Sequence, residues 1–196
     1  MKSTTTSKRD LPMKMFKSAD AFEKWLAKNH SKSRGIWLRF FKKNSGVKSV
    51  FYPEALEVAL CYGWIDALVN KYDERSYLQR FTPRRARSGW SKRNRDHCKR
   101  LIREGRMQAA GLAQIQAAKS DGRWRVAYES PSKMKMPQDF LKEMGKDARA
   151  SEFFKTLDKI NLYAIAWRLQ TARTPEIRQR RMNKILQMLA SGKRLH

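Results

Sequence analysis

The chain has 196 residues, the size of one ordinary domain or of one domain with an extension. Its 44 Lys and Arg outnumber its 18 Asp and Glu, so that the formal net charge is +26, while a hydrophobic fraction of 41% is sufficient for a packed core. These values exclude a wholly disordered chain, and the charges that interrupt every apolar run exclude a transmembrane helix. The charge predicts contact with a polyanion, and a basic surface without a function is the alternative.

The N-terminal segment, residues 1–12, is basic and rich in Ser and Thr, and we expect a disordered tail there. It lacks the apolar core of a secretory signal, which predicts a cytoplasmic protein. Cys61 and Cys98 fall on separate predicted helices and are expected to be free, buried thiols. The three histidines show no metal-ligand spacing with either cysteine, so the sequence predicts neither a metal site nor a cofactor.

The first predicted elements alternate between strands and helices. A short strand is expected over residues 13–16, followed by a helix that Ser18 caps and that ends near residue 29. Residues 36–41 alternate as a strand, with Ile36, Leu38 and Phe40 on one face. Pro53 suits the first turn of a second helix, which ends before Gly63.

A β-hairpin is predicted next, with strands over residues 64–71 and 76–82 that end at Pro83. Ser91 caps a helix that runs to about residue 104, and a further helix covers residues 107–119. Together these elements predict an α+β domain over residues 13–122, with a small mixed or antiparallel sheet of about four strands.

The pattern after residue 122 is different. Residues 123–136 are typical of a linker, and residues 137–196 predict an all-helical region, in which two short helices precede two longer ones. The helix expected over residues 157–171 is apolar on most sides, which indicates burial in a small bundle around Trp167.

The richest stretch in polar and aromatic residues runs from Gly63 to Arg103, and it contains the strongest local charge. Residues 84–106 hold ten Lys and Arg against two acidic residues. The guanidinium group of arginine can form two parallel hydrogen bonds with a phosphate or a carboxylate. The first backbone N–H groups of the helix after Ser91 form the positive end of the helix dipole, which also favours an anion. The residues predicted to form an anion- or ligand-binding site are Asp66, Gln79, Arg80, Thr82, Arg84, Arg85, Trp90, Ser91, Lys92 and Asn94.

Several of these residues have a structural alternative. Asp66 either forms an ion pair that orders the fold, with Arg80 across the hairpin as the candidate partner, or lies in a ligand cleft. Arg80 and Arg84 either bind an anion or connect the hairpin to acidic residues elsewhere in the fold. Trp90 either stacks on a base or covers the core.

The helix after Ser91 is predicted to have one basic face. At about 100° per residue, its cations fall within an arc of about 160°, while Cys98, Leu101 and Ile102 are expected to face the core. A solvated charged face is the alternative to a nucleic-acid contact. The cations on this arc are Lys92, Arg93, Arg95, Lys99, Arg100 and Arg103, and all except Lys92 are assigned to nucleic acid alone.

Sequence blocks in this stretch resemble a known family. G-W-I-D at 63–66, Y-L-Q-R-F-T-P-R-R at 77–85 and W-S-K-R-N at 90–94 are similar to signature blocks of the YdeI/OmpD-associated family, also called bacteriocin-protection proteins. The similarity extends towards the C-terminus, for example through Y-A-I-A-W-R-L-Q-T-A at 163–172. The resemblance implies a role in envelope stress or in resistance to peptides and bacteriocins, and it implies no catalytic residues.

Three functional hypotheses follow from these observations. The favoured one is non-enzymatic binding of an anionic partner, nucleic acid, through the basic helix and the Arg-rich segment. The second is a stress- or bacteriocin-protection factor that acts through protein partners. The third is an enzyme that uses Asp66 with nearby arginines on a small anionic substrate. Against catalysis, His97 and Cys98 are consecutive in a helix and point about 100° apart, and no nucleotide-binding motif is present.

Overall fold

The structure is a computed structural model that describes residues 11–195, so most of the predicted N-terminal tail lies outside the described residues. The chain forms two compact units. Within the described residues, the first unit comprises residues 11–88 and 97–117, and the second comprises residues 89–96 and 118–195. Residues 89–96 therefore belong with the second unit, although the sequence pattern groups them with the first.

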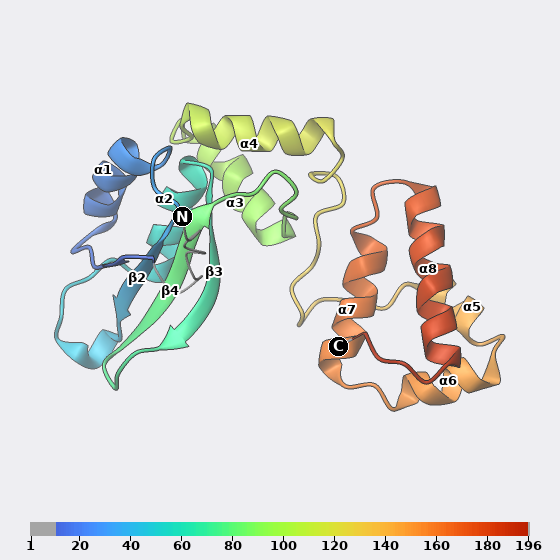
Figure 1. Ribbon diagram of the computed structural model, residues 1–196. Helices are drawn as coiled ribbons and strands as arrows, with labels where there is room; N and C mark the ends of the chain where they lie inside the picture. Colours follow the sequence, from blue (N-terminus) through green and yellow to red (C-terminus); the bar gives the residue numbers. More distant parts are fainter. Residues whose placement is uncertain (1–10, 196) are drawn as a thin grey trace, which may run out of the picture. The chain divides into compact units, whose positions relative to one another are not determined.

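The first unit contains a four-stranded mixed sheet, as predicted (Figure 1). The strands lie in the order β1-β2-β4-β3, with β1 parallel to β2 and the other neighbours antiparallel. Their bounds are Met13–Lys14 for β1, Ile36–Phe41 for β2, Trp64–Lys71 for β3 and Ser76–Pro83 for β4.

One face of this sheet forms the core of the first unit. Ile36 and Leu38 of β2 are fully buried, and Phe81 lies opposite Ile36 on β4. Phe22 packs on Phe81 with ring centroids 5.9 Å apart, which places α1 (Ala19–Asn29) against this face. Each such side chain contributes about 1.5–3 kcal/mol through its burial. The predicted cap is confirmed, since the Ser18 hydroxyl accepts a hydrogen bond from the backbone of α1 at 3.2 Å.

Two glycines allow the helices of the first unit to meet closely. Gly63 follows α2 (Tyr52–Cys61) with φ of +74°, a left-handed conformation that favours glycine. A Cβ at Gly111 would lie 2.3 Å from the carbonyl oxygen of Cys61, so α4 (Ala109–Ser120) passes directly over the end of α2. Helix α3 (Lys92–Arg103) precedes α4 in the chain, and its residues 97–103 belong to the first unit.

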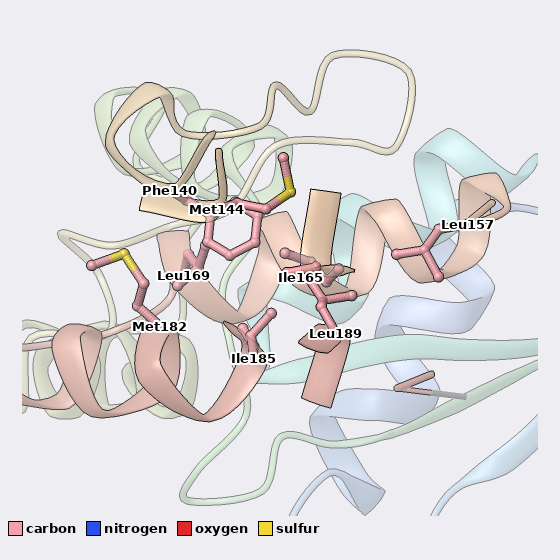
Figure 2. Packing of buried hydrophobic residues seen from close by; sticks show 9 residues of the cluster. Phe140, Met144, Leu157, Ile165, Leu169, Met182, Ile185 and Leu189 are labelled. Carbon is pink, nitrogen blue, oxygen red and sulfur yellow. The ribbon is translucent and has the colours of Figure 1, made fainter. Parts of the chain in front are cut away.

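The second unit is helical, as predicted, and has its own core. Figure 2 shows Phe140, Ile165, Met182 and Ile185 of this core, which come from three different helices. Trp167 is not at the centre, because it is only half-buried and packs edge-on against Tyr128. The helices are α5 (Gln138–Met144), α6 (Ala148–Lys155), α7 (Lys159–Gln170) and α8 (Pro175–Ala190).

Candidate anion-binding site

The Asp66 carboxylate lies inside the first unit, on the sheet face that the helices cover. Its Oδ2 accepts hydrogen bonds from the Tyr52 hydroxyl at 2.8 Å and from the Gln79 side-chain amide at 2.9 Å. Tyr52 belongs to α2 and Gln79 to β4, so one carboxylate connects a helix with both strands of the hairpin. These hydrogen bonds can order the fold, which is one of the two roles predicted for Asp66. The partners, however, are neutral donors rather than a cation.

The anticipated pair between Asp66 and Arg80 does not form. The hairpin register places Asp66 opposite Phe81, while Arg80 lies opposite Trp37 on the neighbouring strand. Because side chains alternate across a strand, Arg80 and Thr82 point to the other face of the sheet from Gln79. The sheet thus separates the predicted ligand-binding residues into two groups, Asp66 with Gln79 on one face and Arg80 with Thr82 on the other.

Two further residues of the predicted site are buried. Arg84 is 6% exposed, and its positive charge lies close enough to Cys98 to lower that pKa, although burial has the larger effect and raises the pKa to about 12. Trp90 is 2% exposed and packs edge-on against Trp124 at 4.9 Å. The Trp90 ring is therefore part of the core and presents almost no surface to a ligand.

The start of α3 is held by local and tertiary contacts. Ser91 Oγ accepts a hydrogen bond from the backbone N–H of Asn94 at 3.1 Å, which confirms Ser91 as the cap. Lys92 Nζ lies 2.6 Å from Glu129 Oε1, so its charge is already neutralised. Arg95 is half-buried and donates to the Trp124 carbonyl at 3.5 Å.

Glu57 neutralises a second group of cations within the first unit. Its carboxylate pairs with Arg100 of α3, with Arg106 at 3.0 Å and with His97 Nδ1 at 3.3 Å. Arg100 and Arg106 also contact Glu104, at 2.8 Å and 3.4 Å. The side chain of Glu57 is only 17% exposed, and it connects α2 to α3 and to the segment after α3. Arg100 thus has a structural partner, whereas the sequence predicted only a contact with nucleic acid for it.

The basic face predicted for α3 is only partly present. Cys98 and Leu101 are fully buried as expected, but Ile102 is 41% exposed. At about 100° per residue, Ile102 lies about 20° from Arg95, at the edge of the charged arc rather than opposite it. Asp96 also falls inside that arc, with its side chain 63% exposed.

Five cations of the 84–106 stretch remain exposed and form no ion pair with any residue between 11 and 195. Lys99 and Arg103 are one turn apart, so they lie side by side on one face of α3. The complete set is Arg85, Arg87, Arg93, Lys99 and Arg103. Because these five side chains are exposed and have no ion pair there, an external anion can reach them without displacing a carboxylate.

Comparison with protein families identifies two matching regions. Residues 14–114 match a family described as a domain of unknown function, DUF8412. Residues 133–192 match the family described as bacteriocin-protection, YdeI or OmpD-associated. The chain belongs to the DUF8412 family, and its C-terminal residues are similar to the YdeI/OmpD-associated family. No curated protein and no solved structure shows significant similarity to the chain.

The YdeI/OmpD-associated match covers α5 to α8, which confirms the resemblance found in the sequence. The blocks between residues 63 and 94 lie instead within the DUF8412 match. No helix between residues 11 and 195 is long and apolar enough to cross a membrane. The same residues contain no group of three or more His, Cys, Asp or Glu that could hold a metal ion.

Sequence reasoning missed the acceptors and donors that organise these side chains. Glu57, Glu129 and Tyr52 lie outside the basic stretch and carry no motif. The excess of cations was the signal that could have indicated such partners, because a half-buried arginine or lysine requires a partner. It also missed a concentration of cations in the helical second unit, where residues 159–195 hold nine Lys and Arg and one acidic residue.

Proposed function

We propose that the protein binds nucleic acid through the exposed, unpaired cations of residues 84–106. The observation that carries the proposal is the pair formed by Lys99 and Arg103, which are exposed, one turn apart and free of ion pairs among residues 11–195. Duplex DNA carries about one negative charge per 1.7 Å of its axis, so neighbouring cations on a helix can neutralise separate phosphates. The net charge of +26 adds long-range attraction.

The binding is expected to be independent of base sequence. The exposed residues are cations that suit phosphate oxygens, and Trp90, the aromatic side chain within the stretch, is buried. Phosphate contacts position a protein on nucleic acid but do not read its bases. A cytoplasmic location stays a prediction, as does the absence of catalysis.

A matched pair of double variants tests the proposal. Lys99→Gln with Arg103→Gln removes the two central cations, while Lys28→Gln with Lys32→Gln removes the same charge from exposed, unpaired positions near the end of α1. Fluorescence anisotropy with labelled duplex DNA and single-stranded RNA at low salt measures affinity. Weaker binding for the first variant alone supports the proposal, whereas equal weakening in both variants would show only a general charge effect.

The second candidate is a protection factor that acts on a protein partner. The match of residues 133–192 to the bacteriocin-protection, YdeI or OmpD-associated family supports it. Retention of a defined protein partner at a salt concentration that abolishes nucleic-acid binding favours this candidate. A protein that binds nucleic acid at low salt and retains no protein at high salt favours the first.

A further inference from the structure

A group of cations on α7 and α8 lacks neutralising carboxylates. Two arginines of this region have acidic partners, since Arg178 pairs with Asp139 at 2.5 and 2.8 Å and Arg173 lies 3.9 Å from Asp121. Four neighbouring cations form no ion pair with any residue in the range 11–195, and they are Arg168, Arg180, Arg181 and Lys184. Four neighbouring cations without an ion-pair partner create a positive potential that favours an anion.

Arg181 is held in a fixed orientation within this group. Its Nη1 donates to the carbonyl oxygen of Arg168 at 2.7 Å and to the Thr171 hydroxyl at 3.3 Å. Burial lowers the pKa of Arg181, and the positive charges of Arg173, Arg168 and Arg180 lower it further. An anion beside this guanidinium would oppose both effects, because it would compensate the lost hydration and the like-charge repulsion.

These side chains border a hollow of about 320 Å³ that has an aromatic wall. Arg168, Arg181 and Lys184 line it together with Trp167, while Ile185 and Met188 supply apolar surface. A hollow of this size is at the lower end of the range for small-molecule sites, about 300–1,000 Å³, and suits one nucleoside better than an extended chain.

Trp167, the aromatic wall, packs against other groups of the second unit. Tyr128 meets the Trp167 ring edge-on, with centroids 6.0 Å apart. A Cβ at Gly89 would lie 4.0 Å from Trp167 Cζ2, so the backbone also approaches the indole closely. Because Trp167 is half-buried rather than buried, part of its surface stays accessible to a ligand. A ring fixed in this way loses little conformational freedom when another ring stacks on it.

We propose that this hollow binds a nucleoside phosphate, with the base against Trp167 and the phosphate between Arg168, Arg181 and Lys184. Aromatic side chains stack on any base, and guanidinium groups form paired hydrogen bonds with phosphate oxygens. The residues of this site all belong to the second unit, whereas Lys99 and Arg103 belong to the first. It does not rest on the proposed function. A free nucleotide and the phosphorylated end of a single strand present the same chemistry.

Isothermal titration of the full-length protein with four small probes tests the two halves of the site. AMP carries base and phosphate, adenosine lacks the phosphate, ribose 5-phosphate lacks the base, and inorganic phosphate lacks both. The proposal requires AMP to bind at least about tenfold more tightly than each of the others, as expected when both contacts contribute. Equal affinity for AMP and ribose 5-phosphate would overturn the stacking contact, and an absence of AMP binding would overturn the site.

Variants locate the binding. The Lys184 side chain is exposed and forms no hydrogen bond within residues 11–195. Lys184→Gln should therefore weaken AMP binding about tenfold without affecting the fold. Lys142→Gln, an exposed lysine of α5, is the matched control and should bind AMP normally. Trp167→Leu should weaken AMP but leave ribose 5-phosphate unchanged. If Lys184→Gln and Lys142→Gln bind AMP equally, the site is wrong.

Two further comparisons identify the source of the ligand and separate the two proposals. A single-stranded oligonucleotide with a 5′-phosphate that competes with AMP, while its 5′-hydroxyl form does not, indicates strand ends. If neither oligonucleotide competes with AMP, the ligand is a free nucleotide. The Lys99→Gln, Arg103→Gln variant should retain AMP binding, so failure of duplex binding and failure of nucleotide binding are distinguishable.

Discussion

The Tyr52 hydroxyl donates a hydrogen bond to Asp66 Oδ2 across 2.8 Å, from α2 to β3. The same oxygen accepts a hydrogen bond from Gln79 of β4. A single carboxylate oxygen thus satisfies two donors that come from different elements. Neither donor is charged, so the contact acts through hydrogen bonding rather than through an ion pair.

Asp66→Asn should destabilise the protein by about 1–2 kcal/mol, because a neutral amide oxygen accepts the hydrogen bonds of Tyr52 and Gln79 more weakly than a carboxylate oxygen does. Tyr52→Phe, which removes one donor and leaves the Asp66 side chain unchanged, should cost about 1 kcal/mol or less. Urea unfolding at pH 7 measures both. An Asp66→Asn variant as stable as the parent would remove the structural role and favour a ligand role for this carboxylate.

Glu57→Gln should also destabilise the first unit, because it removes the negative charge that Arg100 and Arg106 share. We expect a loss of about 1–3 kcal/mol, since the Glu57 side chain is only 17% exposed while its partners are more accessible. Glu152→Gln is the control, because its pair with Lys155 is on the surface and should cost less than about 0.5 kcal/mol. Equal effects in chemical unfolding would mean that the Glu57 network does not stabilise the fold.

The two thiols should be unreactive until the protein unfolds. Burial raises the pKa of Cys61 to about 11 and that of Cys98 to about 12, from an ordinary value of 9.0. Both thiols are therefore protonated as well as inaccessible at pH 8, and a thiol reagent should label them only in denaturant. Rapid labelling of the native protein would contradict their burial.

The same pKa shifts predict an effect of alkaline pH on stability. The folded-state pKa values are raised, so the stabilisation is fully present below pH 9 and is lost progressively as the pH rises towards 11 and 12. Thermal unfolding measured between pH 8 and pH 11 checks this. A Cys98→Ala variant should show a shallower decline. If the decline is unchanged, groups other than this thiol cause it.

Phe140→Ala should destabilise the helical unit by about 3–5 kcal/mol, because Phe140 is fully buried within the core that α5, α7 and α8 share. Ile160→Ala is the contrasting variant, since Ile160 is 68% exposed and its loss should cost less than about 0.5 kcal/mol. Circular dichroism during thermal unfolding compares them. Similar unfolding temperatures would contradict the assigned core.

Local signals predicted the elements well, whereas contacts between distant segments could not be read from the sequence. Ser18 and Gly63 act through their own hydrogen bonds and backbone conformation, so their roles were visible in the chain. The partners of Asp66 depend on how α2 packs on the sheet and on the hairpin register, which shifts between Asp66 and Val69. Tyr52 carried no signal for this contact.

Composition predicted a basic surface but not which cations would be available. Arg100 and Lys92 look the same as Lys99 in the sequence, yet Glu57 and Glu129 neutralise the first two. Helical periodicity gives the direction of each side chain around the helix axis but not which neighbours pack on the helix. It therefore predicts exposure least well for residues at the edge of the polar arc, such as Ile102.

The salt dependence of nucleic-acid binding tests the central claim most directly. For the parent protein, log K for duplex DNA should fall linearly with log salt, with a slope of about −0.9 for each phosphate neutralised. Lys99→Gln with Arg103→Gln should flatten the slope by about 1.8, or by about 1.4 on single strands, while Lys28→Gln with Lys32→Gln should leave it unchanged. No binding of the parent protein to DNA or RNA at low salt, or the same slope in both double variants, would contradict binding through this face of α3.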